Sequence, residues 1–154
     1  WVDWTLPERN APLVRFVRRL VDLRRSRLWL RRDTFLKGTR RGTAAKDVTW
    51  LHPSGREMTD ADWNDSHLRA IAVLLNGAAS RAAATGDLLI VFNADDVAVE
   101  LQLPAPQQGT HWARQFDTGA EDTFADDAAP CFLQRNEVLR VGDRSVVLLE
   151  SVVS

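Results

Sequence analysis

The hydrophobic period changes along this sequence, and that change limits the fold more than any other feature. The first part has apolar residues at helical spacing, at Leu13, Phe16, Val17, Leu20 and Leu23. This spacing predicts a helix from about residue 7 to 27, with Thr5 and Glu8 at the spacing of a capping box. Beyond the helix the apolar residues recur at every second position, which is the period of a β-strand. The sequence therefore predicts one long helix followed by a sheet structure.

Two short segments after the helix predict strands that end in turns. KDVTWLHPSG, residues 46–55, places Val48 and Trp50 on one face of a strand and closes with a Pro-Ser-Gly turn. RAIAVLLNG, residues 69–77, is largely apolar, predicts a buried strand and ends in an Asn-Gly turn. The alanine-rich segment 79–86 lacks core-forming side chains and predicts a loop.

The second half of the sequence predicts further short strands in an antiparallel arrangement. DLLIVFNADDVAVELQLP, residues 87–104, has the pattern of a hairpin whose turn is the NADD segment at 93–96. HWARQFDT predicts a strand with Trp112 and Phe116 on one face, and two more strands are expected at 138–141 and in SVVLLES. Short strands at even spacing after a single helix predict a mainly β fold, an antiparallel β-sandwich.

The composition is that of a globular domain, and it excludes several classes of partner. The 154 residues are 45% hydrophobic and 27% charged, with a net charge of −1, so the molecule has no overall attraction for nucleic acid or anionic membranes. Eight arginines between Arg15 and Arg32 raise a nucleic-acid hypothesis. No aromatic residues interleave with them in a stacking pattern, which favours a solvated helix face. No apolar run approaches the roughly 18 residues that span a membrane.

EMTDADWND, residues 57–65, gathers four carboxylates around a tryptophan and raises the question of a catalytic or metal site. Its second half opens like a calcium loop, but Asp65 stands where such a loop needs glycine, and an isoleucine stands where it needs a bidentate acid. A pair of glycosidase acids must flank one bond from opposite sides, which acids crowded into one turn do not do. A structural interpretation is favoured, in which Thr59 and Asp62 form a capping box and Trp63 packs inward.

No other group of residues assembles a recognisable site. His52, His67 and His111 are far apart and share no ligand spacing, so no metal or other cofactor is expected. Cys131 lies in the apolar segment APCFLQ, which predicts a thiol packed in the core, and a single cysteine fits a reducing compartment. No G-x-S-x-G elbow frames a serine. We therefore expect no catalytic residue in this chain.

Four phrases of the sequence together resemble one protein family. WVDW, FVRRLVDLRR, KDVTWLHPSGREMTDADWND and LLIVFNADDVAVELQLP occur in an order that resembles the C-terminal end of bacterial glycogen debranching enzymes. These are isoamylase-type members of the alpha-amylase superfamily, glycoside hydrolase family 13. The most specific element is the stretch from Trp50 to Asp65, and the resemblance covers nearly the whole chain.

The resemblance implies a division of the chain. In this family a (β/α)8 barrel carries the catalytic acids, and a small β-sandwich follows it. By resemblance, residues 1–30 are the end of the barrel, comprising the loop after its eighth strand and its last helix. Residues 31–154 are the amylase-type C-terminal β-sandwich. The chain begins with Trp1 rather than Met, so we expect it to be a fragment of a longer protein.

The resemblance also implies a function. The family hydrolyses α-1,6 branch linkages of glycogen in the cytoplasm with acids of the barrel, upstream of Trp1, and none of them maps onto this chain. We therefore expect a non-catalytic domain that stabilises its own barrel. Trp1, Asp3 and Trp4 would follow the eighth barrel strand, where they either border a glucan subsite or pack the barrel end. Without the barrel, the apolar stripe of residues 13–23 is expected to drive self-association.

Two alternative functions remain open on sequence grounds. A glucan-binding module would use exposed tryptophans as stacking platforms, and four tryptophans fit a core and a sugar surface equally well. They are Trp29, Trp50, Trp63 and Trp112. Solvent-exposed, coplanar rings would favour this alternative, and buried rings would exclude it. An autonomous small hydrolase that uses the acids at 57–65 is the least favoured alternative.

Overall fold

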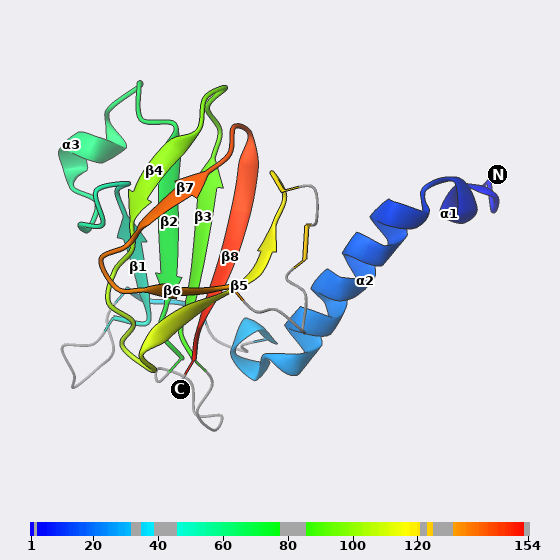
Figure 1. Cartoon of the computed structure of the whole chain (residues 1–154), viewed down its shortest axis with the longest axis horizontal. Helices are drawn as coiled ribbons and strands as arrows, with labels where there is room; N and C mark the ends of the chain where they lie inside the picture. Colours follow the sequence, from blue (N-terminus) through cyan, green and yellow to red (C-terminus); the bar gives the residue numbers. More distant parts are fainter. Residues whose placement is uncertain are drawn as a thin grey trace. The chain divides into compact units, whose positions relative to one another are not determined.

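The computed structural model divides the chain into two compact units, Trp1–Phe35 and Leu36–Ser154 (Figure 1). It describes residues 1, 3–31, 35–38, 46–77, 86–120, 123–124 and 131–152. The first unit is helical, and the second consists mainly of strands around its own hydrophobic core. No helix in these described ranges is long and apolar enough to cross a membrane.

The helical unit has a break that the hydrophobic period does not reveal. It contains α1 (Leu6–Arg9), α2 (Ala11–Ser26) and the 3-10 helix η1 (Leu28–Arg31). The predicted single helix is interrupted at Asn10, because Pro12 has no N–H for the Glu8 carbonyl and its ring would clash with that carbonyl in a continuous helix. The capping box predicted at Thr5 is wrong. Thr5 donates its N–H and hydroxyl to the Asp3 carboxylate instead, at 2.9 and 2.7 Å.

The second unit confirms the predicted mainly β fold and its antiparallel sandwich. Its described elements are β1 (Val48–Leu51), α3 (Asp60–Trp63), β2 (Ala70–Leu75), β3 (Leu88–Asn93), β4 (Val99–Gln102), β5 (His111–Asp117), β6 (Phe132–Gln134), β7 (Val138–Val141) and β8 (Ser145–Val152). Six strands form one sheet in the order β1-β2-β3-β8-β5-β6, and β4 pairs with β7 in a second, two-stranded sheet. Every pairing is antiparallel.

The core fills the space between the two sheets. Its buried members are Leu51, Ala72, Leu74, Leu89, Val91, Leu101, Leu103, Trp112, Val141, Val147 and Leu149. Ala72 lies opposite Val91, and Val91 lies opposite Val147, so alternate residues of three neighbouring strands point to the same side. We call that side of the six-stranded sheet its inner face and the other side its outer face. The Trp112 indole N–H donates to the Pro104 carbonyl at 2.8 Å, which satisfies its only donor inside the core.

The structure corrects the hairpin predicted at residues 87–104. Both strands exist, but β3 pairs with β2 and β8, whereas β4 pairs with β7 in the smaller sheet (Figure 1). The Asn93 side chain explains the change of sheet, because its amide donates to the carbonyls of Val97 and Gly142, each at 2.8 Å. These bonds hold a wide turn that leads the chain from one sheet to the other.

A β-bulge in β5 separates two aromatic residues that were predicted to share a face. Arg114 lies opposite Leu149 and Phe116 lies opposite Leu148, so the register shifts between Arg114 and Phe116. Because consecutive residues of β8 face opposite ways, Trp112 points into the core while Phe116 lies on the outer face. The prediction of a common face for Trp112 and Phe116 is therefore wrong.

A buried carboxylate fixes the connecting segments at one end of the larger sheet. Asp87 is fully buried and accepts hydrogen bonds from the backbone N–H groups of Gly77, Gln107 and Gln108 at 3.0, 2.6 and 2.8 Å. Its own N–H donates to the Ser151 hydroxyl at 2.6 Å. A buried carboxylate is tolerated when it has such partners. Through these bonds Asp87 links the segments at Gly77 and at Gln107 to the last strand, β8.

Two predictions about the connections have different outcomes. Cys131 is exposed, so the prediction of a buried thiol is wrong. It lies just before β6, the edge strand of the larger sheet, and its backbone carbonyl accepts the Arg114 N–H at 3.1 Å. The loop predicted at 79–86 lies outside the described residues except for Gly86.

Candidate functional site

The acid-rich stretch follows a tight loop that folds back on the edge strand β1. The Gly55 N–H donates to the His52 carbonyl at 2.8 Å, and the His52 N–H donates to the Arg56 carbonyl at 2.9 Å. Gly55 has a φ of +80°, which glycine adopts without strain, as the predicted Pro-Ser-Gly turn requires. The Met58 N–H then donates to the Trp50 carbonyl at 2.9 Å, so the returning chain lies alongside β1.

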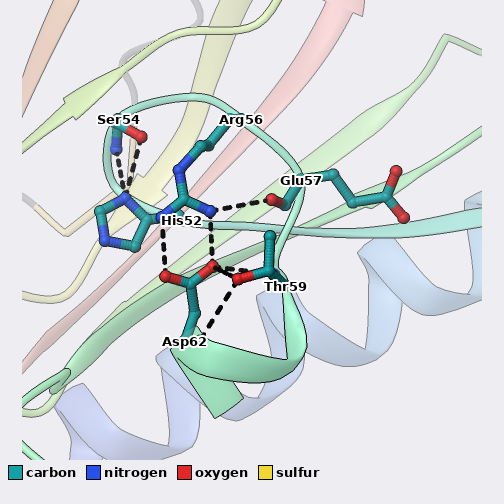
Figure 2. A network of polar contacts seen from close by, with 6 residues as sticks. All are labelled: His52, Ser54, Arg56, Glu57, Thr59 and Asp62. Carbon is teal, nitrogen blue, oxygen red and sulfur yellow. Dashed lines mark hydrogen bonds and ion pairs between the residues drawn. The ribbon is translucent and has the colours of Figure 1, made fainter. Parts of the chain in front are cut away.

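The single-turn helix α3 begins with the capping box that the sequence predicts. The Thr59 N–H donates to the Asp62 carboxylate at 2.8 Å, and the Asp62 N–H donates to the Thr59 hydroxyl oxygen at 3.4 Å. Each residue therefore satisfies a backbone donor of the other, which is what stabilises the start of so short a helix. Figure 2 shows both side chains facing each other across this turn.

Arg56 holds the Asp62 carboxylate with two parallel bonds (Figure 2). The guanidinium donates to both carboxylate oxygens, at 2.5 and 2.6 Å, and the Thr59 hydroxyl adds a bond of 2.7 Å. These bonds, with that from Arg56 the strongest cause, hold the pKa of Asp62 well below its usual range. Asp62 raises the pKa of Arg56 in return. An acid that stays ionised and has both oxygens engaged is a poor proton donor, so the geometry gives Asp62 a structural role.

The other acids of the stretch do not join Asp62 in a catalytic pair. Glu57 forms an ion pair with Lys46, and Asp65 accepts the backbone N–H of His67 at 2.8 Å. Asp60 contributes its backbone carbonyl to the Asn64 side-chain amide. Glu57, Asp62 and Asp65 are thus each engaged in a separate local contact, which is not the arrangement of two acids that flank one scissile bond.

The histidines lie in separate local contacts. His52 Nδ1 accepts the Ser54 N–H at 3.1 Å (Figure 2), His67 lies 3.4 Å from Asp65, and His111 Nδ1 lies 2.8 Å from the Thr110 hydroxyl. Among the described residues, no group of three or more His, Cys, Asp or Glu side chains is arranged to hold a metal ion.

Trp50 of β1 and Trp63 of α3 form an exposed aromatic pair. Trp50 and Trp63 are 40% and 52% exposed, with ring centroids 5.6 Å apart and ring planes at 75°. The prediction that Trp63 packs inward is therefore wrong, because Trp63 is half exposed and packs edge-on against Trp50 at the edge of the sheet. Trp50 lies opposite Val73 and so belongs to the outer face, whereas its neighbour Leu51 belongs to the core. Of the other tryptophans in question, Trp112 is buried.

The predicted glucan-contacting residues at the N-terminus are exposed. Trp1 and Trp4 are 123% and 82% exposed, and Asp3 is bonded to Thr5. The Thr5 hydroxyl and N–H lower the pKa of Asp3, so this carboxylate is ionised at neutral pH. The three residues present two indoles and an anion, which is a chemistry suited to contact with a sugar.

The sequence predicted the capping box but not the Arg56–Asp62 ion pair, which we call the brace of α3. Arg56 precedes Asp62 by six residues, and no helical or strand period predicts a contact at that spacing. The contact exists because the turn at Gly55 and the start of α3 bring the two side chains within hydrogen-bond distance. The signal that would have found it is the bidentate match of a guanidinium to a carboxylate across a tight turn.

Comparison with known proteins places the chain in a family. Residues 47–150 match the family model described as "Isoamylase, C-terminal". The chain belongs to the isoamylase C-terminal family. The match begins one residue before β1 and ends within β8, so it covers both sheets of the sandwich.

Curated relatives and a solved structure agree with this family. The chain is 39% identical over 127 residues to a "Glycogen operon protein GlgX homolog" of Mycobacterium tuberculosis, which covers 77% of this chain and 18% of that protein. It is 30% identical over 116 residues to an "Isoamylase" of Pseudomonas amyloderamosa, which covers 75% of this chain and 14% of that protein. The chain therefore spans less than a fifth of these relatives.

A pullulanase from Anoxybacillus sp. LM18-11, solved in complex with maltotetraose, shares the fold. Its TM-score is 0.54 at 14% identity, and the alignment covers 98% of this chain and 17% of the pullulanase. In the pullulanase, too, the matching segment is a small part of a much longer chain. The isoamylase C-terminal family domain thus forms a β-sandwich in this chain, and the relatives that contain it are much longer proteins.

Proposed function

We propose that this chain is the non-catalytic C-terminal part of a cytoplasmic bacterial enzyme that hydrolyses α-1,6 branch linkages in glycogen. In this proposal the sandwich stabilises the catalytic barrel of that parent enzyme, by which we mean the longer protein that carries the chain. The names of the relatives, a glycogen operon protein and an isoamylase, support the parent activity. The acids of the stretch 57–65 serve local structure, which supports a non-catalytic role.

The observation that carries the stabilising role is the apolar outer face of the six-stranded sheet. The core cluster between the two sheets uses the inner face, yet the outer face also bears large apolar side chains, of which Val73 and Leu148 are buried within this chain. Ile90 lies opposite both Val73 and Leu148, and Phe92 lies opposite Ile71. Phe92 and Trp50 are each 40% exposed on this face. A sheet that is apolar on both sides is typical of one covered on both sides, so this face suits a contact with another domain.

In the same proposal, residues 1–30 are the end of the barrel, and residues 31–154 are the sandwich. The helix α2 supports this division, because it has an apolar stripe and none of its residues is buried. Leu13, Val17 and Val21 recur at intervals of four on that stripe and are 60%, 48% and 41% exposed. The barrel would cover the stripe in the parent. The isolated chain is expected to self-associate through it.

The stabilising role is tested by removing the sandwich from the parent. A parent that lacks residues 36–154 is expected to unfold at a lower temperature and to lose debranching activity at temperatures where the intact parent works. Scanning calorimetry and release of reducing ends from glycogen measure the two effects. An unchanged unfolding temperature of the remaining catalytic part would contradict the proposal.

A second candidate function is contact with an α-glucan, and the exposure of Trp1 and Trp4 favours it. In the parent these residues and Asp3 would border a glucan subsite at the carboxyl end of the barrel strands. Calorimetric titration of the chain with glycogen and with a linear maltooligosaccharide tests this function. Saturable binding that the Trp4→Ala variant lacks would support it, and no binding would remove it for the isolated chain.

A further inference from the structure

The pair Trp50 and Trp63 is an exposed aromatic feature of the sandwich that stands on ordered backbone. Trp50 lies in β1, which pairs with β2 on one side and bonds to Met58 on the other. Trp63 ends a helical turn that is fixed by the capping box and by the Arg56 brace. Both indoles therefore stand on backbone that is already ordered, and covering them costs little conformational entropy.

The polar groups beside these indoles are engaged with one another. Asp62 has both oxygens bonded to Arg56 and Thr59, and Glu57 is paired with Lys46. A sugar site needs polar groups that are available to read hydroxyls, and it gains most from rings that share a stacking plane. The planes of Trp50 and Trp63 meet at 75° instead. This surface is thus suited to burial against protein rather than to binding a glucan chain.

The aromatic pair also adjoins an apolar row of the outer face, in which Val73 and Leu148 are buried and Trp50 is 40% exposed. Trp50 lies opposite Val73, Val73 lies opposite Ile90, and Ile90 lies opposite Leu148, so one row of apolar residues crosses four strands of the outer face. Phe92 is exposed one row away. Trp and Arg are enriched among the few interface residues that carry most binding energy, and Arg56, whose side chain is 49% exposed, is bonded to Asp62, the residue before Trp63.

We infer that Trp50 and Trp63, braced by Arg56 and Asp62, are the anchor through which the sandwich docks on the catalytic domain of its parent enzyme. This inference rests on the proposed function, and it names the residues that carry the contact. The occupant is the catalytic domain because the chain spans only 18% of the GlgX homolog, so the relatives supply a much larger body within one polypeptide. Contacts between domains of one chain commonly centre on such patches.

The test compares three altered parents with the unaltered parent by scanning calorimetry. The first lacks residues 36–154, the second carries Trp63→Ala, and the third carries Val138→Ala as a matched control. Val138 is 53% exposed on β7, in the smaller sheet and away from the outer face. We expect Trp63→Ala to reproduce at least half of the loss in unfolding temperature of the catalytic domain that the truncation causes. Val138→Ala should leave that temperature unchanged.

The outcomes separate the anchor from the stabilising role. If the truncation lowers the unfolding temperature of the catalytic domain and Trp63→Ala does not, the anchor is wrong while the proposed function stands. If the truncation has no effect, the proposed function fails and the anchor fails with it. A Trp63→Ala parent that unfolds normally but loses retention on glycogen would assign the pair to sugar binding and overturn the inference.

Two further measurements exclude misfolding as the cause. In the 154-residue chain, Trp63→Ala should leave the unfolding temperature of the sandwich unchanged, because Trp63 is 52% exposed and lies outside the core. In the parent, Trp63→Phe should restore part of the loss, since it keeps an aromatic ring on the same turn. A Trp63→Ala chain whose sandwich unfolds early, together with no recovery by Trp63→Phe, would reduce the residue to a local structural role and contradict the inference.

Discussion

Helix α2 and the sandwich have equally clear hydrophobic periods but differ in what covers their apolar sides. In α2 no residue is buried, and Leu13 remains 60% exposed. In the sandwich, Leu89, Trp112 and Val147 are completely buried between two sheets. The hydrophobic period thus identifies the side of an element that needs covering, but it does not say where the cover comes from.

The same contrast exists within the larger sheet. Its inner face is closed by the two-stranded sheet, whereas its outer face carries Trp50 and Phe92 at 40% exposure. The inner face is therefore covered within the chain, whereas the outer face is covered only in part: Leu148 is buried there, and the exposed aromatic residues are available to a partner. If this contrast holds, the stability of the sandwich should depend on its buried core and hardly on the exposed apolar side of α2.

The largest effect is expected from Trp112→Ala in the core. Removing a completely buried indole leaves a large cavity and an unpaired Pro104 carbonyl, so the free energy of unfolding should fall by about 4 kcal/mol. Urea titration of the 154-residue chain measures the change. Trp4→Ala is the matched control, because Trp4 is 82% exposed and its loss should hardly affect stability. If both variants lost the same free energy of unfolding, the distinction between a covered sandwich core and an uncovered helical unit would be wrong.

A smaller effect is expected at the cap of α3. Thr59→Ala removes the hydroxyl that accepts the Asp62 N–H and donates to the Asp62 carboxylate, and it should lower the free energy of unfolding by about 1 kcal/mol. Thr59→Ser keeps the hydroxyl and should retain most of the stability. Thermal unfolding of the two variants checks this, and a Ser variant as unstable as the Ala variant would rule out the cap as the cause.

The Arg56–Asp62 brace should be visible in the acid dependence of stability. Because the pKa of Asp62 is lowered on folding, this group stabilises the native state above its unfolded pKa of about 3.9. That contribution is lost as the pH falls through the lower pKa of the folded state. Arg56→Gln removes the main cause, so the variant should be less stable at pH 7 and should lose less stability on acidification. Parallel acid curves for variant and wild type would contradict this.

The smallest effect on the sandwich is expected from Leu13→Ser on the open stripe of α2. Since Leu13 is 60% exposed, the free energy of unfolding of the sandwich should change by less than about 0.5 kcal/mol. The self-association expected of the isolated chain should weaken, which sedimentation velocity measures. A wild-type chain that remains monomeric at high concentration would show that the stripe does not drive association.

Local sequence rules predicted the elements of this fold well. The alternation in residues 46–55 and the apolar segment 145–151 located β1 and β8, and the Thr59–Asp62 spacing located the cap of α3. These features depend on neighbours within a few residues, which a single sequence contains. The resemblance in the stretch from Trp50 to Asp65 identified the family for the same reason, since the whole motif is contiguous.

Errors arose where distant residues decide the structure. Asn93 bonds to Gly142 and thereby separates β3 from β4, which no local turn rule reveals. The bulge before Phe116 is defined by its register with β8. The exposure of Trp63 and Cys131 follows from their places at opposite edges of the larger sheet, and strand order was not available from periodicity.

The central claim is that the outer face of the sandwich is covered by the catalytic domain in the parent enzyme. Hydroxyl-radical footprinting with mass spectrometry tests it directly, by comparing oxidation of Trp50, Trp63 and Phe92 in the isolated chain and in the parent. The prediction is that all three react readily in the isolated chain and are protected in the parent, while Val138 reacts equally in both. Equal oxidation of the three aromatic residues in both proteins would contradict the claim.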